Sequence, residues 1–219
     1  MQDKARAYSL VILDFDGVVV ESNSVKTDAF SRVFSRYPEY FDVMMRFHHE
    51  NVSASRFAKF EHLCSLLGRP NDATLQNELA SEFSVSTRDA VARVPFVPGA
   101  EAFLTEFSEN IPLYLASVTP QADLDQILEA RGLTRFFRKA YGCPPWTKPK
   151  AILDAMHIEK TPPESVVLIG DSSGDQKAAA EAGVDFIARD SGLVFDHPVE
   201  RTFGDLKMIA EYLRTRLSY

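Results

Sequence analysis

Short apolar runs alternate with amphipathic segments over the C-terminal part of the chain. This alternation is typical of parallel strands joined by helices, because each connecting helix packs its apolar stripe against the sheet. We expect strands at residues 9–13, 113–117, 166–170 and 185–188, with a weaker one at 139–142.

Helix signals occupy the intervals between these runs. Thr119 and Pro120 predict an N-cap followed by a proline at the first helical position, and this helix should end at Gly132. A second helix is expected from about Gly174, through an alanine-rich stretch, to Gly183. The chain should end in a further helix, at residues 206–213.

The interval from residue 22 to residue 93 has a different pattern. It lacks convincing alternation with a period of two and instead carries apolar residues at helical spacing. We therefore expect an α/β fold in which residues 1–20 and 94–219 form a Rossmann-like parallel sheet flanked by helices. Residues 21–93 should form an inserted α-helical domain.

Composition narrows the classes of function. A formal net charge of -7 and a pI near 5.3 argue against a nucleic-acid-binding surface, which is normally basic.

The first ten residues, MQDKARAYSL, lack the apolar stretch of a signal peptide, and no segment is apolar enough to predict a membrane span. Two cysteines far apart in sequence imply neither a zinc site nor a disulfide framework. A reducing cytoplasm is the expected compartment.

Polar residues follow several of the predicted strands. In an open parallel sheet the ligand crevice lies at the carboxyl ends of the strands, so these residues should converge. A pair of aspartates two residues apart after a buried strand is costly, because like charges repel and lose solvation there. A positive ligand is therefore expected near them. The converging residues are Asp14 and Asp16, Ser117, Asp171 and Asp175, and Lys148, which we place in a loop ahead of a helix.

The order and spacing of these residues resemble the haloacid dehalogenase superfamily of phosphotransferases. The resemblance covers four motifs in order: DFDG at Asp14, the serine of LYLASVT at Ser117, Lys148 before Pro149, and GDSSGD at Asp171. The helical insertion is similar to the cap of phosphoglycolate phosphatase and β-phosphoglucomutase. A DxD pair alone would be weak, whereas four motifs in order are specific.

The resemblance implies a role for each motif residue. Asp14 would attack phosphorus and form an aspartyl-phosphate, and Asp16 would act as general acid and base. Asp14 and Asp171 would bind Mg²⁺ through their carboxylates, with the main-chain carbonyl of Asp16 as a further ligand. The remaining predicted roles are phosphate binding by Ser117, the Val118 N–H and Lys148, and orientation of Lys148 or a metal-bound water by Asp175.

Asp16 also distinguishes branches of this superfamily. Dehalogenases and phosphonoacetaldehyde hydrolases lack an aspartate at this position, so its presence points to phosphate esters. We expect a Mg²⁺-dependent phosphatase of a small phosphorylated metabolite, such as a sugar phosphate. A phosphomutase of the β-phosphoglucomutase type is the alternative enzyme, and a non-catalytic phosphoacceptor or binding module is the alternative from another class.

Substrate specificity should depend on the inserted domain, whose residues would face the leaving group. Lys26, Arg56 and Lys59 are the candidates, because cations there suit a carboxylate, a second phosphate or vicinal hydroxyls. Solvated helix charges explain Arg56 and Lys59 equally well. Glu21 replaces the aspartate that related enzymes carry after this strand. The sequence leaves the substrate and the oligomeric state open.

Overall fold

A computed structural model describes residues 7–217 of the chain, so residues 1–6 of the predicted α/β domain lie outside the described part. Contacts divide the chain into two compact units. The α/β unit comprises residues 1–21 and 95–219, and the helical unit comprises residues 22–94. Among the described residues, no helix combines the length and the apolarity needed to cross a bilayer.

The α/β unit contains a six-stranded sheet in the order β3-β2-β1-β4-β5-β6, and every neighbouring pair of strands is parallel. The chain therefore extends the sheet first from β1 through β2 to β3, and then from β1 on the other side through β4. Such a reversal of direction opens a crevice at the carboxyl ends of the central strands. The strands are β1 (Leu10–Leu13), β2 (Leu113–Ser117), β3 (Lys139–Gly142), β4 (Val166–Gly170), β5 (Asp185–Arg189) and β6 (Thr202–Phe203).

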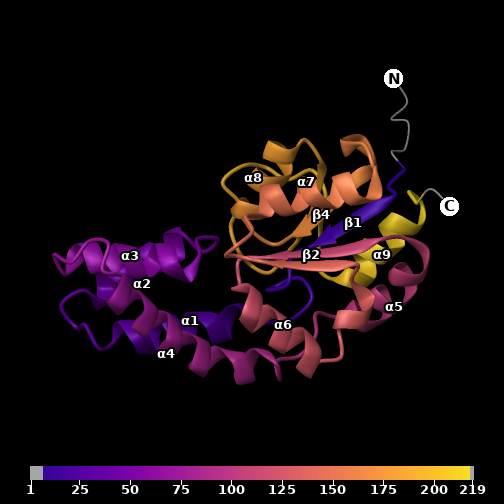
Figure 1. The fold of residues 1–219 in the computed structure, drawn as a ribbon. Coiled ribbons are helices and arrows are strands. Elements are labelled where there is room, and N and C mark those ends of the chain that lie inside the picture. The colour runs from indigo at the N-terminus through magenta and orange to yellow at the C-terminus, as the bar shows by residue number, and fades with distance from the viewer. Residues whose placement is uncertain (1–6, 218–219) are drawn as a thin grey trace. The chain divides into compact units, whose positions relative to one another are not determined.

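Helices cover both faces of this sheet, as Figure 1 shows. One face carries α7 (Lys148–Glu159) and α8 (Ser173–Ala182), and the other carries α5 (Ala100–Asn110), α6 (Gln121–Ala130) and α9 (Leu206–Arg214). The α7 and α8 face buries one continuous apolar cluster from strands and helices. Alternate residues of each strand supply it, for example Leu10 and Ile12 of β1, because successive side chains point to opposite faces.

The helical unit consists of α1 (Asn23–Phe34), α2 (Phe41–Glu50), α3 (Arg56–Leu66) and α4 (Ala73–Val91). Two of these helices begin with a side chain that satisfies a free backbone N–H, namely Ser55 before α3 and Asp72 before α4. Phe30, Phe34, Phe60 and Phe83 form the centre of its apolar core. Burial of each such ring contributes about 1.5–3 kcal/mol.

The predicted fold class is confirmed, with five strands at the expected positions. The structure adds β6 and α2, which the sequence pattern did not indicate. β6 has only two residues, and α2 buries only Met44 and His48, so neither leaves a clear apolar period. The predicted N-cap at Thr119 is wrong, because Pro120 occupies the N-cap position of α6 and no side chain caps this helix.

Candidate active site

Three buried carboxylates meet at the carboxyl ends of the two central strands. Asp14 follows β1 and Asp171 follows β4, and these strands pair so that Leu13 lies opposite Ile169. Asp175 comes from the first turn of α8. One carboxylate oxygen of each of the three aspartates lies within 4.8 Å of those of the other two. The predicted convergence of strand-end residues is therefore present in the α/β unit.

Lys148 lies between two of these carboxylates. Its Nζ is 2.9 Å from Asp14 Oδ1 and also donates to Asp175 Oδ1. The sequence placed this lysine in a loop, whereas the structure makes it the first residue of α7, with Pro149 next to it in the first turn. Proline is favoured there because its missing N–H has no partner within the helix. The helix start thus fixes the backbone from which Lys148 reaches the acids.

Asp175 is held from both of its oxygens. Oδ2 accepts from the Ser172 hydroxyl at 2.5 Å and from the Ser172 N–H at 3.2 Å. The N–H bond and the Ser172 side chain, which accepts from the Asp175 N–H, form a capping box at the start of α8. Gly170 makes room for this side chain, because a Cβ there would lie 2.2 Å from Asp175 Cβ. The glycine and serine of the GDSSGD segment therefore position Asp175, and Oδ1 remains directed at Lys148.

The carboxylates of the site repel one another. Burial raises the pKa of Asp14 well above its usual value, and repulsion from Asp175, Asp171 and Asp16 adds to this, while Lys148 opposes it. Burial also lowers the pKa of Lys148, but attraction to Asp14 and Asp175 outweighs this effect and leaves its pKa raised. Lys148 therefore stays protonated, and one cation compensates only part of the clustered negative charge.

Asp16 lies in a tight turn after β1. The N–H groups of Val19 and Val20 donate to the Phe15 carbonyl, and Gly17 adopts a left-handed conformation with a φ of 74°. Asp16 Oδ2 accepts from the Ser117 hydroxyl at 3.4 Å and from the Thr119 hydroxyl at 3.2 Å. Ser117 is the last residue of β2, so this contact joins the ends of two neighbouring strands. Val118 follows it and is half-buried.

The donor set fits a hard divalent cation. Mg²⁺ prefers carboxylate and carbonyl oxygens, and Asp14, Asp171 and Asp175 present such oxygens close together in a buried site. The side-chain triad includes Asp175 rather than Asp16, which the resemblance assigns to the metal through its main-chain carbonyl. Asp175 is also committed to Lys148 and Ser172, so Asp14 and Asp171 are the carboxylates better suited to a metal.

A comparison of the whole sequence with known families identifies the family of the protein. The sequence pattern of haloacid dehalogenase-like hydrolases matches residues 11–189, which includes every residue of the site described above. The chain belongs to this family. It is therefore a haloacid dehalogenase-like hydrolase, and the match includes the whole acidic triad.

Solved structures of related proteins share the fold of this hydrolase. A candidate haloacid dehalogenase-like hydrolase from Bacteroides fragilis has 23% identity and a TM-score of 0.75, with 92% of this chain and 99% of that chain covered. A candidate hydrolase of the same superfamily, YfnB from Bacillus subtilis, was solved bound to magnesium, with 16% identity, a TM-score of 0.69 and coverage of 95% and 100%.

A variant of CbbY from Rhodobacter sphaeroides was solved in complex with xylulose 1,5-bisphosphate. It has 16% identity and a TM-score of 0.70, with 90% of this chain and 94% of that chain covered. At such identities the likeness establishes the fold alone. No curated protein matches the hydrolase.

Sequence reasoning missed Arg189, which supports the turn that follows Asp16. Arg189 is the last residue of β5 and its side chain is buried. Its NH1 donates to the Gly17 carbonyl at 3.1 Å and to Glu21 Oε2 at 3.1 Å, and its Nε donates to the Gly204 carbonyl at 3.3 Å. Arginine suits this position because its planar guanidinium holds a carboxylate with two parallel bonds. Glu21, the residue that departs from related enzymes, is therefore an anchor of this turn.

In the helical unit, two of the three predicted specificity residues, Arg56 and Lys59, each lie over one ring of an aromatic pair. The Arg56 guanidinium is 4.6 Å from the centre of the Phe83 ring and donates to the Ser84 hydroxyl at 2.6 Å. Phe83 in turn packs against Phe30, with ring centres 4.3 Å apart. Arg56 is buried, whereas Lys26 of α1 is partly exposed.

Lys59 lies inside the helical unit and is only 1% exposed. Its Nζ lies 3.0 Å from His48 Nδ1, donates to the Val52 carbonyl at 3.1 Å, and is 4.6 Å from the centre of the Phe30 ring. Burial, together with the smaller effect of the Lys26 charge, lowers the pKa of Lys59 to about 7. The structure thus gives Lys59 internal partners, Arg56 is also buried, and Lys26 is the most accessible member of the trio.

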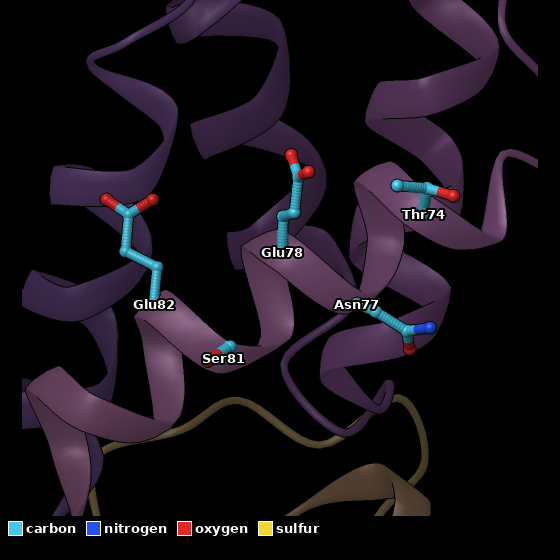
Figure 2. Close-up of a pocket in the computed structure, with 5 residues that line it drawn as sticks. All are labelled: Thr74, Asn77, Glu78, Ser81 and Glu82. Carbon is cyan, nitrogen blue, oxygen red and sulfur yellow. The ribbon is translucent and has the colours of Figure 1, made fainter.

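A surface depression lies along α4 of the helical unit, as Figure 2 shows. All of its lining residues carry polar side chains and come from that one helix: Thr74, Asn77, Glu78, Ser81 and Glu82. Glu82 also pairs with Arg36. None of the predicted site residues lines this depression.

Proposed function

We propose that this hydrolase cleaves phosphate monoesters of a small metabolite, with Mg²⁺ as cofactor and an aspartyl-phosphate on Asp14 as intermediate. The observation that carries the proposal is the placement of Lys148. Its Nζ contacts Asp14 and Asp175 at the point where the oxygens of Asp14, Asp171 and Asp175 gather within 4.8 Å. A carboxylate beside a fixed ammonium group, at a cation site, suits attack on an anionic phosphoryl group.

In this mechanism Asp14 is the nucleophile. One of its carboxylate oxygens bonds to phosphorus while the ester P–O bond breaks. Lys148 contributes positive charge to the transferring phosphoryl oxygens, and Asp175 holds the ammonium group in place. The Ser117 hydroxyl and the Val118 N–H bind phosphoryl oxygens at the end of β2.

Asp16 transfers protons in both half-reactions. It gives a proton to the leaving oxygen as the aspartyl-phosphate forms, and it takes a proton from the water that later attacks this intermediate. Its position two residues after Asp14, in a turn that Gly17 and Arg189 hold, keeps it close to the leaving oxygen without contact to phosphorus.

Asp14 and Asp171, with the main-chain carbonyl of Asp16, would hold Mg²⁺, and the ion when bound neutralises negative charge on the phosphoryl group. Magnesium in the solved structure of YfnB supports this choice of cation. Repulsion among the carboxylates of this chain supports a bound cation independently, because Lys148 compensates only part of their charge.

The helical unit supports a substrate whose leaving group carries a second anionic group. Lys26 and Arg56 are cations of this unit, and Arg56 is fixed by Phe83 and Ser84. A second phosphate or a carboxylate on the substrate would complement them. The sugar bisphosphate in the CbbY structure supports the same class of ligand.

The proposal is tested by phosphate release from a panel of phosphomonoesters with and without Mg²⁺. The panel pairs each sugar monophosphate with its bisphosphate and includes p-nitrophenyl phosphate. The wild type should release phosphate only with Mg²⁺, and Asp171→Asn should lose this activity, while Asp196→Asn, at an exposed site in the same unit, should retain it. Arg56→Met should lower kcat/KM for the bisphosphates more than for the monophosphates.

Other results would favour the alternatives. Transfer of phosphate between positions of a sugar, with little release, would indicate a phosphomutase. Stable phosphorylation of the protein without turnover would indicate a phosphoacceptor. Release that is unchanged in Asp171→Asn would contradict the proposed metal site.

A further inference from the structure

Thr119 lies two residues after Ser117, in the segment that joins β2 to α6, and it is only 3% exposed. Its sequence context predicts a helix cap. In the structure, however, Pro120 occupies the N-cap position of this helix.

The hydroxyl instead reaches the turn after β1. Thr119 Oγ1 donates to Asp16 Oδ2 at 3.2 Å, a contact between residues 103 positions apart in the chain. The Thr119 N–H donates to Ser117 Oγ at 3.1 Å, and Ser117 Oγ donates to the same Asp16 oxygen at 3.4 Å. Thr119 thus contacts both the proposed phosphate ligand and the proposed general acid.

The backbone at Thr119 is tied to the neighbouring strand β3. Its carbonyl accepts from the Cys143 N–H at 2.9 Å. Two residues later, Gln121 Oε1 accepts from the Gly142 N–H at 2.7 Å, and its Nε2 donates to the Ala140 carbonyl at 3.1 Å. A Cβ on Gly142 would lie 2.8 Å from the Thr119 carbonyl oxygen, so the glycine permits this close approach. These contacts fix the point from which the hydroxyl donates.

We propose that Thr119 is a positioning residue for Asp16, whose Oδ2 it holds by a hydrogen bond so that Oδ1 carries the proton for the leaving oxygen. The inference rests on the proposed phosphatase function. When a phosphoryl group engages the Ser117 hydroxyl, the Ser117 contact to Asp16 is lost. The Thr119 bond then keeps the carboxyl group in its orientation.

The chemistry of the step is balanced as follows. An Asp14 oxygen forms a bond to phosphorus, the ester P–O bond breaks, and its electron pair goes to the leaving oxygen. That oxygen takes the proton from Asp16 Oδ1, which gives a neutral alcohol and an Asp16 carboxylate. Thr119 keeps its own proton and touches neither the phosphoryl group nor the leaving group, so its effect acts through Asp16.

This arrangement predicts a dependence on the leaving group. An alkoxide is a poor leaving group and needs the proton, whereas p-nitrophenolate is a stable anion and needs it little. A positioned general acid contributes about 10²–10⁴-fold to rate. Loss of the Thr119 hydroxyl should therefore lower kcat/KM for an alkyl ester by about 10- to 100-fold and for p-nitrophenyl phosphate by less than about 3-fold, because kcat/KM reports formation of the aspartyl-phosphate.

The test compares Thr119→Val, which keeps the shape but lacks the hydroxyl, with Thr119→Ser, which keeps the hydroxyl. Thr105→Val is the matched control, because the Thr105 hydroxyl donates to a backbone carbonyl on the exposed surface of α5. For each variant, kcat and KM are measured with p-nitrophenyl phosphate and with the fastest alkyl ester of the panel above. Thermal unfolding verifies the fold, and Thr119→Ala replaces the valine variant if valine prevents folding.

We expect the valine variant to lose kcat/KM selectively on the alkyl ester, and the serine variant to restore most of it, because kcat/KM reports the step in which the leaving oxygen departs. An equal loss of kcat/KM on both substrates would overturn the inference, because it would show a general structural role. Unchanged kcat/KM on both would overturn it as well. A wild type that releases no phosphate from either substrate would instead overturn the proposed function, and the role of Thr119 with it.

Discussion

The two units of the protein contain buried charge clusters of different sign, one mainly acidic around Asp14 and one cationic around Lys59. In the α/β unit, Asp14, Asp171 and Asp175 are buried together with Lys148. In the helical unit, the buried charges named above are the cations Arg56 and Lys59, held by a hydroxyl, an imidazole, a backbone carbonyl and aromatic faces. Burial of charge is costly unless it is compensated.

This difference indicates what each unit is built to receive. The acids of the α/β unit exceed their cation in number, and the proposed Mg²⁺ would complete their compensation. In the helical unit, Lys59 is enclosed by contacts within the unit, whereas Lys26 and Arg56 are the cations that we propose for an anionic group of the substrate. The largest effects of substitution should therefore occur among the acids, where charge and chemistry coincide.

Among the substitutions considered, Asp14→Asn in the acidic cluster should have the largest effect on activity. It removes the proposed nucleophile and a carboxylate of the acidic cluster, so phosphate release should fall by at least about 10⁴-fold. Repulsion from Asp171, Asp175 and Asp16 also disappears, so the variant should unfold at a temperature no lower than the wild type in the presence of a chelator. Assays of phosphate release and thermal unfolding measure both effects. A variant that keeps wild-type activity would contradict the assignment.

Gly170→Ala should disrupt the same cluster through sterics alone. The added Cβ would lie 2.2 Å from Asp175 Cβ, so the carboxyl group must leave its place between Ser172 and Lys148. We expect a loss of about 2–4 kcal/mol in the free energy of unfolding, measured by chemical denaturation. The matched control is Gly204→Ala, where the nearest atom to the new Cβ is 3.8 Å away. Equal stability of the two variants would contradict the close packing.

In the helical unit, Lys59→Met should change how the free energy of unfolding depends on pH. The groups that face Lys59 are His48 of α2 and Lys26 of α1, and the pKa of Lys59 is lowered from 10.5 to about 7. Between these two values the unfolded chain binds one more proton than the folded chain. The free energy of unfolding should therefore rise with pH in this window, by about 1.4 kcal/mol per unit, and the cost of the buried cation should be fully present below about pH 7.

His48 contributes in the same direction at lower pH, because burial and the charges of Lys59 and His49 lower its pKa to about 3. Chemical denaturation followed by circular dichroism at pH 7, 8 and 9 measures the slope. The single tryptophan, Trp146, lies in the α/β unit, and its fluorescence reports that unit separately. Lys59→Met should flatten the circular dichroism slope, and an unchanged slope in this variant would rule out Lys59 as its origin.

Arg189→Lys should have the smallest effect. Lysine keeps the charge but cannot hold both Glu21 oxygens and the Gly17 carbonyl with one planar group. The turn that carries Asp16 should loosen, and kcat should fall by about 3- to 10-fold with little change in stability. Steady-state kinetics measures this, with Arg216→Lys near the chain end as control. A loss equal to that of Asp14→Asn would show that Arg189 contributes directly to chemistry.

The sequence alone predicts the sheet and the main acids because both depend on local signals. Apolar runs such as residues 166–170 mark the strands, and an aspartate directly after a run is placed at the crevice by the topology of parallel sheets. This rule places Asp14 and Asp171 together, whereas the roles of Lys148 and Asp175 came from the family resemblance.

The supporting contacts could not be predicted, because they join residues that only the fold brings together. Thr119 has a sequence context that suggests helix capping, and nothing nearby indicates its bond to Asp16. Arg189 is 168 positions from Glu21, and an arginine at a strand end carries no distinctive pattern. Burial of Lys59 was equally hidden, because its position on α3 fits an exposed face as well as a buried one.

The account's central claim is that Asp14 becomes phosphorylated during turnover. The most direct measurement is acid quenching of the wild type during turnover of a ³²P-labelled phosphomonoester with Mg²⁺, followed by mass spectrometry of its peptides. The account predicts labelled phosphate on the peptide that contains Asp14, with none in Asp14→Asn and none without Mg²⁺. Turnover of the substrate with the label on another residue would contradict it.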